Sequence, residues 1–419
     1  MNKQIIKIPD GYSFQNYDVY NFEPALAVYN WEIVAEKVVI DMSHCFHANY
    51  QSLALLTLYI WYLNSQGIQI EFSFSHKNEG ASKMWHLMGA TSWYQVLTKS
   101  YQNFKGHDCK PLIAIKNQQD CNTALLKIES YTKGFHVEYE KILRYVISEL
   151  LYNTLEHGFF CQKIGNEEKR ISSIIQLKWS QNKQELRLII ADLGIGIKKH
   201  LEATYQPFEN HYSAIRYAIQ PQVSGTFGIN EPYKTKDNAG VGLYIASNIL
   251  QRLNADMHII SGDGWVHISP RQITNRTMNT TWRGTFVLVN LSLEKDFSLS
   301  LHALMSEFRE AAIQQISRRK QADEQEKFYL SIENYFGRYA EDKEAALKYR
   351  DKKLIPAVNK GQPLLIDFDN VISAPHSFLS GLLATPIKLL GLKAYKKIKI
   401  VNAAPEIRET VDYILDENT

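Results

Sequence analysis

The chain has 419 residues with a formal net charge of +3, and 45% of its residues are hydrophobic while 22% are charged. This composition indicates a globular protein of about two to four domains, and the near balance of charge gives no electrostatic reason to expect nucleic acid or a membrane as partner. No CxxC pair occurs, so we expect reduced, buried thiols in a cytoplasmic protein rather than a disulfide framework or a zinc site. The cysteines stand at positions 45, 109, 121 and 161.

The first predicted elements alternate between strand and helix. Residues 38–42, VVIDM, combine β-branched residues with an acid, which predicts a buried strand. A helix is predicted over 51–65; its apolar stretch LALLTLYIWYL is too short to span a bilayer and is expected to be buried. A second strand after Gly67 and a helix ending near Gly89 complete a small α/β domain, which we assign to 1–120.

The clearest helix of the sequence is predicted over 136–158. Its apolar side chains recur at helical spacing, which predicts that one face packs against a core. Glu149 and Asn153 are four residues apart, so they lie one above the other beside this apolar stripe. Asparagine is a weak helix former, and its place inside a helix calls for a functional explanation. The stripe consists of Leu143, Ile147, Leu150, Leu151 and Thr154.

Two strands, ISSIIQLKW and ELRLIIAD, are predicted next, and the second ends at Asp192. The segment 197–237 mixes glycine and proline with polar residues and is long for a loop, which favours a functional lid. The stretch VGLYIASNILQRLNA is then predicted to be a helix. The stretches ADMHIISGDGWVHIS and WRGTFVLVNL are predicted to finish the unit as strands.

Two glycine-rich turns flank these elements. In DLGIG, Asp192 can accept a hydrogen bond from an exocyclic amine, and Gly194 and Gly196 leave room for a flat base. In NAGVG, Gly240 and Gly242 come directly before a helix, where backbone N–H groups and the positive end of the helix dipole attract phosphate. Taken alone, each motif also fits an ordinary turn. Their order along the chain is the more specific signal.

The order is an ExxxN helix, then DxGxG, then GxG before a helix, then GT-F in a closing strand. This order resembles the GHKL ATP-binding fold of gyrase, heat-shock chaperones, histidine kinases, MutL and anti-sigma-factor kinases. The resemblance covers residues 125–292, and we assign 121–295 to such a domain. It implies an α/β (α+β) fold, with a central GHKL two-layer α/β sandwich flanked by small α/β domains.

The resemblance implies roles for the residues that match the helix and the first turn. Asn153 matches the ligand of a Mg²⁺ ion that bridges the phosphates of ATP, and an amide oxygen is a hard ligand suited to magnesium. Glu149 matches the acid that orients or deprotonates the attacking nucleophile. Asp192 matches the residue that recognises adenine, and Gly194 and Gly196 match the lining of the base pocket.

Further roles follow from the same resemblance. Asn238, Gly240 and Gly242 match the turn that binds the phosphates, although the fuller glycine run of many relatives is missing here. Thr285 matches the threonine that supports the adenine-binding aspartate, and 197–237 matches the ATP lid. Because the lid varies within the family, no lid residue is assigned a contact.

The flanking regions also carry patterns. Residues 296–340 have a helical composition without a sustained heptad, so we expect a helical connector. Residues 341–419 resemble a STAS-like domain in LLIDFDNV, SAPHSFLSGLL and KKIKIVNAAPEI, and VVIDMSHC gives the N-terminal domain a remote likeness to it. The Asp-Ser-Ser-Gly of phosphorylated STAS proteins is absent, and we expect Ser377 to be a helix N-cap.

Three functions remain open at this point. The first is a switch that binds ATP and Mg²⁺, hydrolyses ATP slowly and controls association with a protein partner or a second copy of the chain. The second is an anti-sigma-type serine kinase acting on a STAS partner. The third is a scaffold that holds the nucleotide without catalysis. No membrane partner is expected, and nucleic acid is not favoured.

Overall fold

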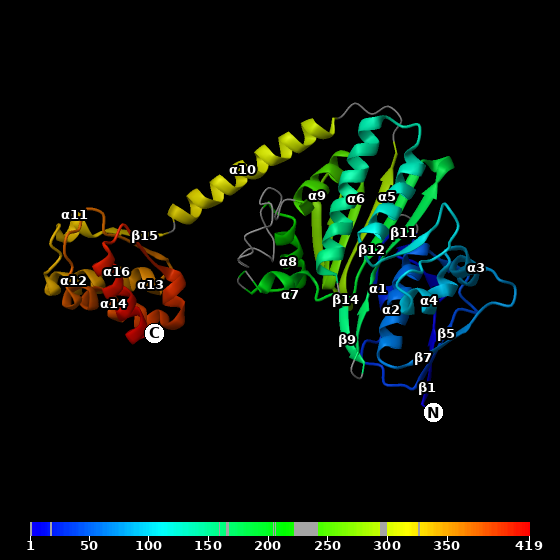
Figure 1. The fold of residues 1–419 in the computed structure, drawn as a ribbon, viewed down its shortest axis with the longest axis horizontal. Helices are drawn as coiled ribbons and strands as arrows, with labels where there is room; N and C mark the ends of the chain where they lie inside the picture. Colours follow the sequence, from blue (N-terminus) through cyan, green and yellow to red (C-terminus); the bar gives the residue numbers. More distant parts are fainter. Residues whose placement is uncertain are drawn as a thin grey trace. The chain divides into compact units, whose positions relative to one another are not determined.

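The computed structural model describes the backbone of residues 2–16, 19–158, 160–164, 167–203, 205, 207–221, 242–293, 300–325 and 327–419. Within these ranges, the side chains of residues 16, 157, 160–164, 167–170, 313 and 315–325 are not described. The chain divides into two compact units, Met1–Ala312 and Ile313–Thr419 (Figure 1). The N-terminal α/β region and the predicted nucleotide-binding region therefore belong to one unit. The alternation of helices and parallel and antiparallel strands confirms the α/β fold class.

The N-terminal part of the first unit contains a parallel sheet in the order β1-β5-β7, and α2 connects β5 to β7. The predicted strand at VVIDM and the predicted buried helix after it are both confirmed. The strands are β1 Lys3–Lys7, β2 Gly11–Tyr12, β3 Gln15–Asn16, β4 Val19–Tyr20, β5 Lys37–Asp41, β6 His47–Ala48 and β7 Gln69–Ser73. The helices are α1 Glu23–Leu26, α2 Tyr50–Ser65, α3 Gly80–Leu87, the 3-10 turn Ala90–Ser92 and α4 Trp93–Thr98.

A five-stranded antiparallel sheet in the order β13-β14-β12-β11-β8 forms the centre of the first unit. Its strands are β8 Leu112–Ile115, β11 Ser173–Ser180, β12 Glu185–Ala191, β13 Asp256–Ile268 and β14 Ile273–Ser292. A separate hairpin pairs β9 Phe160–Ile164 with β10 Glu167–Ile171. The helices are α5 Gln118–Thr132, α6 Val137–His157, α7 Ile197–Glu202, α8 His211–Ala218, α9 Gly242–Arg252 and the 3-10 turn Gln181–Lys183.

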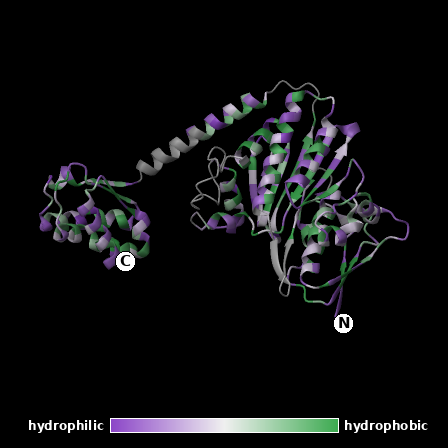
Figure 2. Cartoon of the chain, in the orientation of Figure 1, coloured by the Kyte–Doolittle hydropathy of each residue, from purple (hydrophilic) through white to green (hydrophobic). Residues whose placement is uncertain are grey.

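The two faces of the central sheet are covered by different parts of the chain. Helices α5, α6 and α9 lie on one face, where Leu188 and Ile190 of β12 join their core (Figure 1). On the other face, Ile189 and Ala191 of the same strand pack into the N-terminal core, and α2 contacts β11 and β12. The alternation along β12 is that of a strand buried on both sides. Figure 2 shows that hydrophobic and hydrophilic residues alternate along the helices that cover the sheet.

The segment 197–237 was expected to be a long loop, and this is wrong for its first half. It contains α7 and α8, and α8 begins with a capping box in which the Asn210 side chain accepts from Ser213 N and the Ser213 side chain pairs with the Asn210 backbone. Residues 222–241 lie outside the described residues, and with them Asn238 and Gly240 of the predicted phosphate turn.

The second unit repeats the plan of the N-terminal sheet. Its three strands are parallel in the order β15-β16-β17, and α14 connects β16 to β17 as α2 connects β5 to β7. The central strands end in Asp41 and Asp367, so the similarity between the two ends of the sequence has a structural counterpart. The strands are β15 Phe328–Ser331, β16 Leu364–Asp367 and β17 Ile398–Val401.

The connector expected over 296–340 is helical only in part. The long helix α10 covers Leu301–Gln325, but β15 follows it and pairs with β16, so a strand of the last sheet precedes the predicted boundary. Ser377 is not the N-cap of α14, because that position is Pro375 and no side chain caps the helix. The remaining helices are α11 Ile332–Phe336, α12 Lys343–Tyr349, the π-helix Arg350–Leu354, α13 Ile355–Asn359, α14 His376–Leu390, the 3-10 turn Gly391–Lys393, α15 Ala394–Lys397 and α16 Pro405–Asn418.

Candidate functional site

The helix α6 carries two of the predicted site residues. It begins after His136, whose side chain accepts from Glu138 N, and it ends at Gly158, whose N–H donates to Thr154 O at 2.8 Å. The predicted apolar stripe is buried against the sheet. Glu149 and Asn153 beside it are half-buried. No hydrogen bond joins the Asn153 side chain to the rest of the described chain, so its amide oxygen is available to a ligand.

Asp192 directly follows β12 and is buried, with 7% of its surface exposed. Its Oδ1 accepts from Gly194 N at 2.8 Å and from Thr285 N at 3.1 Å. Burial raises the pKa of the Asp192 carboxyl to about 7, and the two backbone hydrogen bonds oppose this shift. The other carboxyl oxygen has no hydrogen-bond partner among the described residues, so it can serve a ligand.

Two glycines missed by the sequence analysis make room for Asp192. A Cβ placed on Gly158, at the end of α6, would lie 2.8 Å from Asp192 Cβ. A Cβ placed on Gly284 of β14, where φ is +102°, would lie 2.8 Å from Asp192 Oδ1. The carboxyl is therefore enclosed between the last turn of α6 and β14. Gly284 stands directly before the threonine of the RGTF motif, which was the available signal.

The side chain of Glu149, which projects from α6, contacts the first residue of α9. Its carboxylate is so close to the α-carbon of Gly242 that a Cβ there would overlap it. Burial raises the pKa of the Glu149 carboxyl, and a hydrogen bond from the Tyr145 hydroxyl, one turn earlier on α6, opposes this shift. The structure thus brings together Glu149 and Gly242, which the family resemblance matches to the catalytic acid and to the phosphate turn.

Ser261 fixes the glycine turn to the sheet. Its hydroxyl is buried, accepts from Ile197 N at 2.9 Å and donates to Gly284 O at 2.9 Å. The Thr285 hydroxyl lies 3.2 Å from the Ser261 hydroxyl, while the Thr285 N–H supports Asp192. Sequence reasoning identified Thr285 but missed Ser261, because no motif marks a serine in the middle of a strand.

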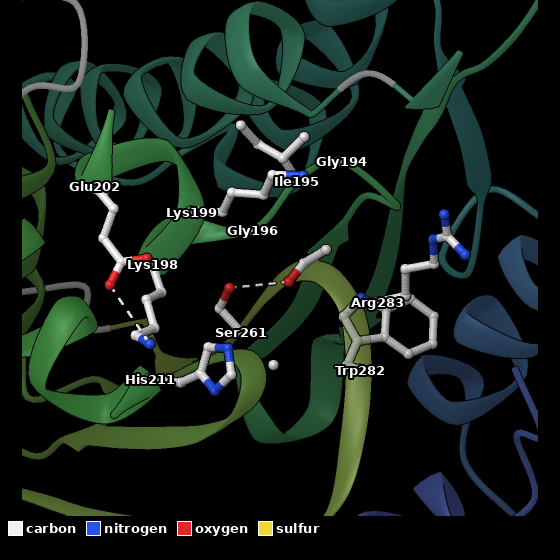
Figure 3. A pocket seen from close by; sticks show the side chains of 12 residues that line it. Gly194, Ile195, Gly196, Lys198, Lys199, Glu202, His211, Ser261, Trp282 and Arg283 are labelled. Atoms are coloured by element: carbon white, nitrogen blue, oxygen red, sulfur yellow. Dashed lines mark hydrogen bonds and ion pairs between the residues drawn. The ribbon is translucent and has the colours of Figure 1, made fainter. Parts of the chain in front are cut away.

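A pocket of about 740 Å³ adjoins the glycine turn (Figure 3). Gly194 and Gly196 contribute to its lining, whereas Glu149, Asn153 and Asp192 do not. The glycine turn therefore both lines this pocket and bonds to Asp192 through Gly194 N. In the part of the chain that the structure describes, no group of three or more His, Cys, Asp and Glu side chains could hold a metal ion.

Two family models match the chain. Residues 138–295 match the model described as histidine kinase-, DNA gyrase B-, and HSP90-like ATPase. The chain contains a GHKL ATPase domain. Residues 346–408 match a STAS-like domain of unknown function, which lies within the second compact unit. No curated protein was found to match the chain.

The match to the GHKL domain includes both α6 residues, Asp192 and Thr285, so the expectations from the motif order and the family model agree on the region. ATP binding is the property that this family supplies. Residues 1–137 lie outside both matches, and the likeness of the N-terminal region to a STAS domain rests on its strand pattern and topology alone. Among the described helices, none is long and apolar enough to cross a membrane.

Proposed function

We propose that the GHKL domain binds ATP with Mg²⁺, hydrolyses it slowly, and thereby changes how the STAS-like part of the chain associates with a protein partner or a second copy. The observation that carries the proposal is the position of α6. Glu149 on this helix meets Gly242 at the start of α9, and Gly158 at its end meets Asp192. One helix therefore borders both the base-recognition residue and the helix start expected to bind phosphate.

Adenine recognition is assigned to Asp192. Two backbone N–H groups hold one oxygen of its carboxyl, and the second oxygen can accept from the exocyclic amine of adenine. The site is buried, so this hydrogen bond forms away from competing water. Guanine carries a carbonyl oxygen at the corresponding ring position and cannot donate there, so we expect preference for adenine nucleotides.

Magnesium binding is assigned to Asn153. The amide oxygen is a hard ligand of the kind that Mg²⁺ takes, and the ion commonly completes its shell with phosphate oxygens and water. When bound, Mg²⁺ would offset the negative charge of the phosphates. Asn153 lies one helical turn from Glu149. An ion held by Asn153 and a water molecule activated by Glu149 would therefore lie close together.

Hydrolysis is assigned to Glu149 as general base. A water oxygen attacks the γ-phosphorus, its proton passes to the Glu149 carboxylate, and the bond from the γ-phosphorus to the bridging oxygen breaks to leave ADP and phosphate. Burial raises the pKa of Glu149, which makes the carboxylate a stronger base than an exposed one. The hydrogen bond from the Tyr145 hydroxyl opposes this rise and so favours the ionised form that a base requires.

The serine kinase remains a second candidate because the second unit exposes a serine in a suitable place. Ser377 is exposed in the first turn of α14, directly after the loop that follows the central strand β16. In this case Glu149 would accept the proton of a serine hydroxyl instead of that of water. The acceptor would be a STAS-like domain, in this chain or in a partner.

The test combines binding and turnover on the full chain. Calorimetry with Mg-ATP should give a saturable titration, and a flat titration would contradict nucleotide binding of any kind. With ATP labelled at the γ-phosphate, free phosphate supports the switch and labelled protein supports the kinase. The Glu149→Gln variant should keep binding and lose turnover by about 100-fold or more. Glu140→Gln, at the start of α6, is the matched control and should turn over normally.

A further inference from the structure

The pocket at the glycine turn, here called the turn pocket, is a defined concavity between α7, α8 and the β13–β14 hairpin. Its volume of about 740 Å³ falls within the range of small-molecule sites. Figure 3 shows Lys198 and His211 at one side, Trp282 and Arg283 at the other, and Ser261 between them. All of its lining residues are among those the structure describes.

The turn pocket is distinct from the candidate nucleotide site. No residue of α6 or α9 lines it, and neither does Asp192. Ile197, whose N–H donates to Ser261, and Thr285 are also absent from its lining. The two sites adjoin at the glycine turn, because Gly194 and Gly196 line the turn pocket and are also matched to the base pocket, and at Gly284, which lines the turn pocket and contacts Asp192.

Positive charge dominates the lining. Three side chains, Lys198, Lys199 and Arg283, carry full positive charges, and Glu202 is the opposing acid. Glu202 pairs with Lys198 at 3.4 Å, so these two charges offset each other, and Lys199 and Arg283 give the lining its net positive charge. Lys199 is exposed and forms no ion pair with another described residue. A concave surface of one sign attracts ligands of the opposite charge.

Two side chains of the lining, Arg283 and His211, are held by neighbouring residues. The Arg283 guanidinium lies 5.0 Å from the ring centre of Tyr62, and its Nη1 donates to the Tyr62 hydroxyl at 3.3 Å. His211 Nδ1 lies 2.6 Å from Asp263 Oδ1, which fixes the ring on the opposite side. Because these contacts limit rotamer freedom, less entropy is lost when an anion binds.

We propose that the turn pocket binds a small organic anion carrying phosphate or carboxylate groups, and that this ligand acts on the nucleotide site through the glycine turn. The link is a chain of contacts: Gly194 N donates to Asp192, and Ser261 ties the first residue of α7 to Gly284. The binding of an anion is argued from the pocket alone. The effect of the anion on the nucleotide site rests on the proposed function, because it requires that ATP binds at Asp192.

The experiment uses the full chain and two probes, pyrophosphate for the phosphate class and citrate for the carboxylate class. Acylation of Lys199 by a soluble ester, followed by mass spectrometry, reports occupancy directly. We expect at least one probe to protect Lys199 and to leave Lys183, in the turn before β12, unprotected. Protection should weaken as ionic strength rises. Equal labelling of Lys199 with and without both probes would overturn the proposal.

Substitutions test at which site the probe binds. Lys199→Glu and Arg283→Glu should each weaken its binding by about tenfold, and Lys183→Glu, with the same charge change at the other end of β12, should not. Asn153→Ala should leave probe binding unchanged. If Asn153→Ala abolished it while the charge reversals did not, the probe would be bound at the nucleotide site and the turn pocket would be excluded.

The coupling is measured separately by titrating ATP with and without the probe that protects Lys199. We expect the ATP dissociation constant to change at least about threefold in the wild type and to remain constant in Lys199→Glu. An unchanged constant in the wild type would refute the coupling. A chain that binds the probe but not ATP would contradict the proposed function and leave the anion site intact.

Discussion

The carboxylate of Glu149 lies against the α-carbon of Gly242, so that the side chain from α6 occupies the space where any other residue at the start of α9 would place its Cβ. This contact joins a candidate catalytic side chain to the first residue of the helix expected to bind phosphate. It gives the glycine a specific role, which is to let the carboxylate approach the backbone.

Gly242→Ala should therefore reduce ATP turnover by at least about tenfold while leaving the fold intact, because alanine favours helix formation but displaces the Glu149 carboxylate. Turnover and thermal unfolding are the two measurements. In a Glu149→Gln background the added methyl group should have little further effect on turnover. Independent, multiplicative losses in the double variant would contradict the contact as the cause.

Asp192 should make stability depend on pH. Its folded pKa of about 7 lies above the usual value of 3.8, so the folded state holds a proton that the unfolded state releases between pH 4 and 7. The free energy of unfolding should fall as pH rises through this window, by roughly 4 kcal/mol at most. Asp192→Asn removes this dependence, so its stability relative to wild type should increase from pH 5 to pH 8. Urea unfolding at several pH values measures the free energy of unfolding of each protein. If this free energy changed with pH in the same way in the two proteins, the prediction would be refuted.

Ser261→Ala should destabilise the first unit by about 1–3 kcal/mol, because it leaves Ile197 N and Gly284 O without their partner in a buried place. It should also weaken ATP binding, since the glycine turn is no longer held to β14. Ser247→Ala is the control, because that hydroxyl is buried but only bonds to Tyr244 O on its own helix. Equal losses in the two variants, by urea unfolding and calorimetry, would show that Ser261 has no special part in the turn.

Tyr145→Phe should shift the pH dependence of turnover. The tyrosine hydroxyl opposes the rise that burial imposes on the pKa of Glu149, so its removal should raise that pKa further. A base must be ionised to act, and the acidic limb of the pH–rate profile should therefore move to higher pH. Tyr152→Phe, exposed on the same helix, should leave the profile unchanged. A profile that stays in place in Tyr145→Phe would remove Tyr145 from the account of Glu149.

The parts of the site that lie on regular elements could be predicted from the sequence. The period of α6 placed Glu149 and Asn153 beside its buried stripe, and the apolar run of β12 ended at Asp192 as expected. Ser261 and Gly158 were missed because their importance comes from contacts between elements far apart in the chain. Such contacts leave no periodic pattern in the local sequence.

The first half of the expected lid shows why a composition rule failed. Glycine and proline are concentrated in the second half of 197–237, whereas His211–Ala218 form a helix. The signal that was missed is the pair Asn210 and Ser213, which has the spacing of a capping box. A helix start signal in the sequence thus outweighed the average composition of the longer segment.

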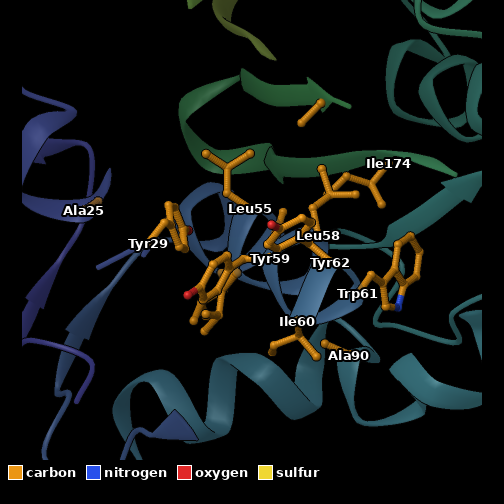
Figure 4. Close-up of a cluster of buried hydrophobic side chains, with 14 of the residues drawn as sticks. Ala25, Tyr29, Leu55, Leu58, Tyr59, Ile60, Trp61, Tyr62, Ala90 and Ile174 are labelled. Atoms are coloured by element: carbon orange, nitrogen blue, oxygen red, sulfur yellow. The ribbon is translucent and has the colours of Figure 1, made fainter. Parts of the chain in front are cut away.

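The complete burial of α2 was foreseen, but its cause was not. Every residue of this helix except Asn64 is buried, because it contacts β7, α3 and α4 as well as β11 and β12. Figure 4 shows Leu55, Leu58 and Tyr62 of the helix close to Ile174 of β11. A helix that is apolar all round predicts burial, yet it does not say which element supplies the second cover.

This shared core has a practical consequence for anyone who wishes to isolate the ATPase region. A fragment cut to the family match, 138–295, would lose the edge strand β8 and strip the cover from Ile189, Phe286 and other apolar side chains on the outer face of the sheet. Such a surface invites aggregation in water. The compact unit that keeps both faces of the sheet covered runs from the first strand of the chain to Ala312 in α10, so homology limits and folding limits differ here.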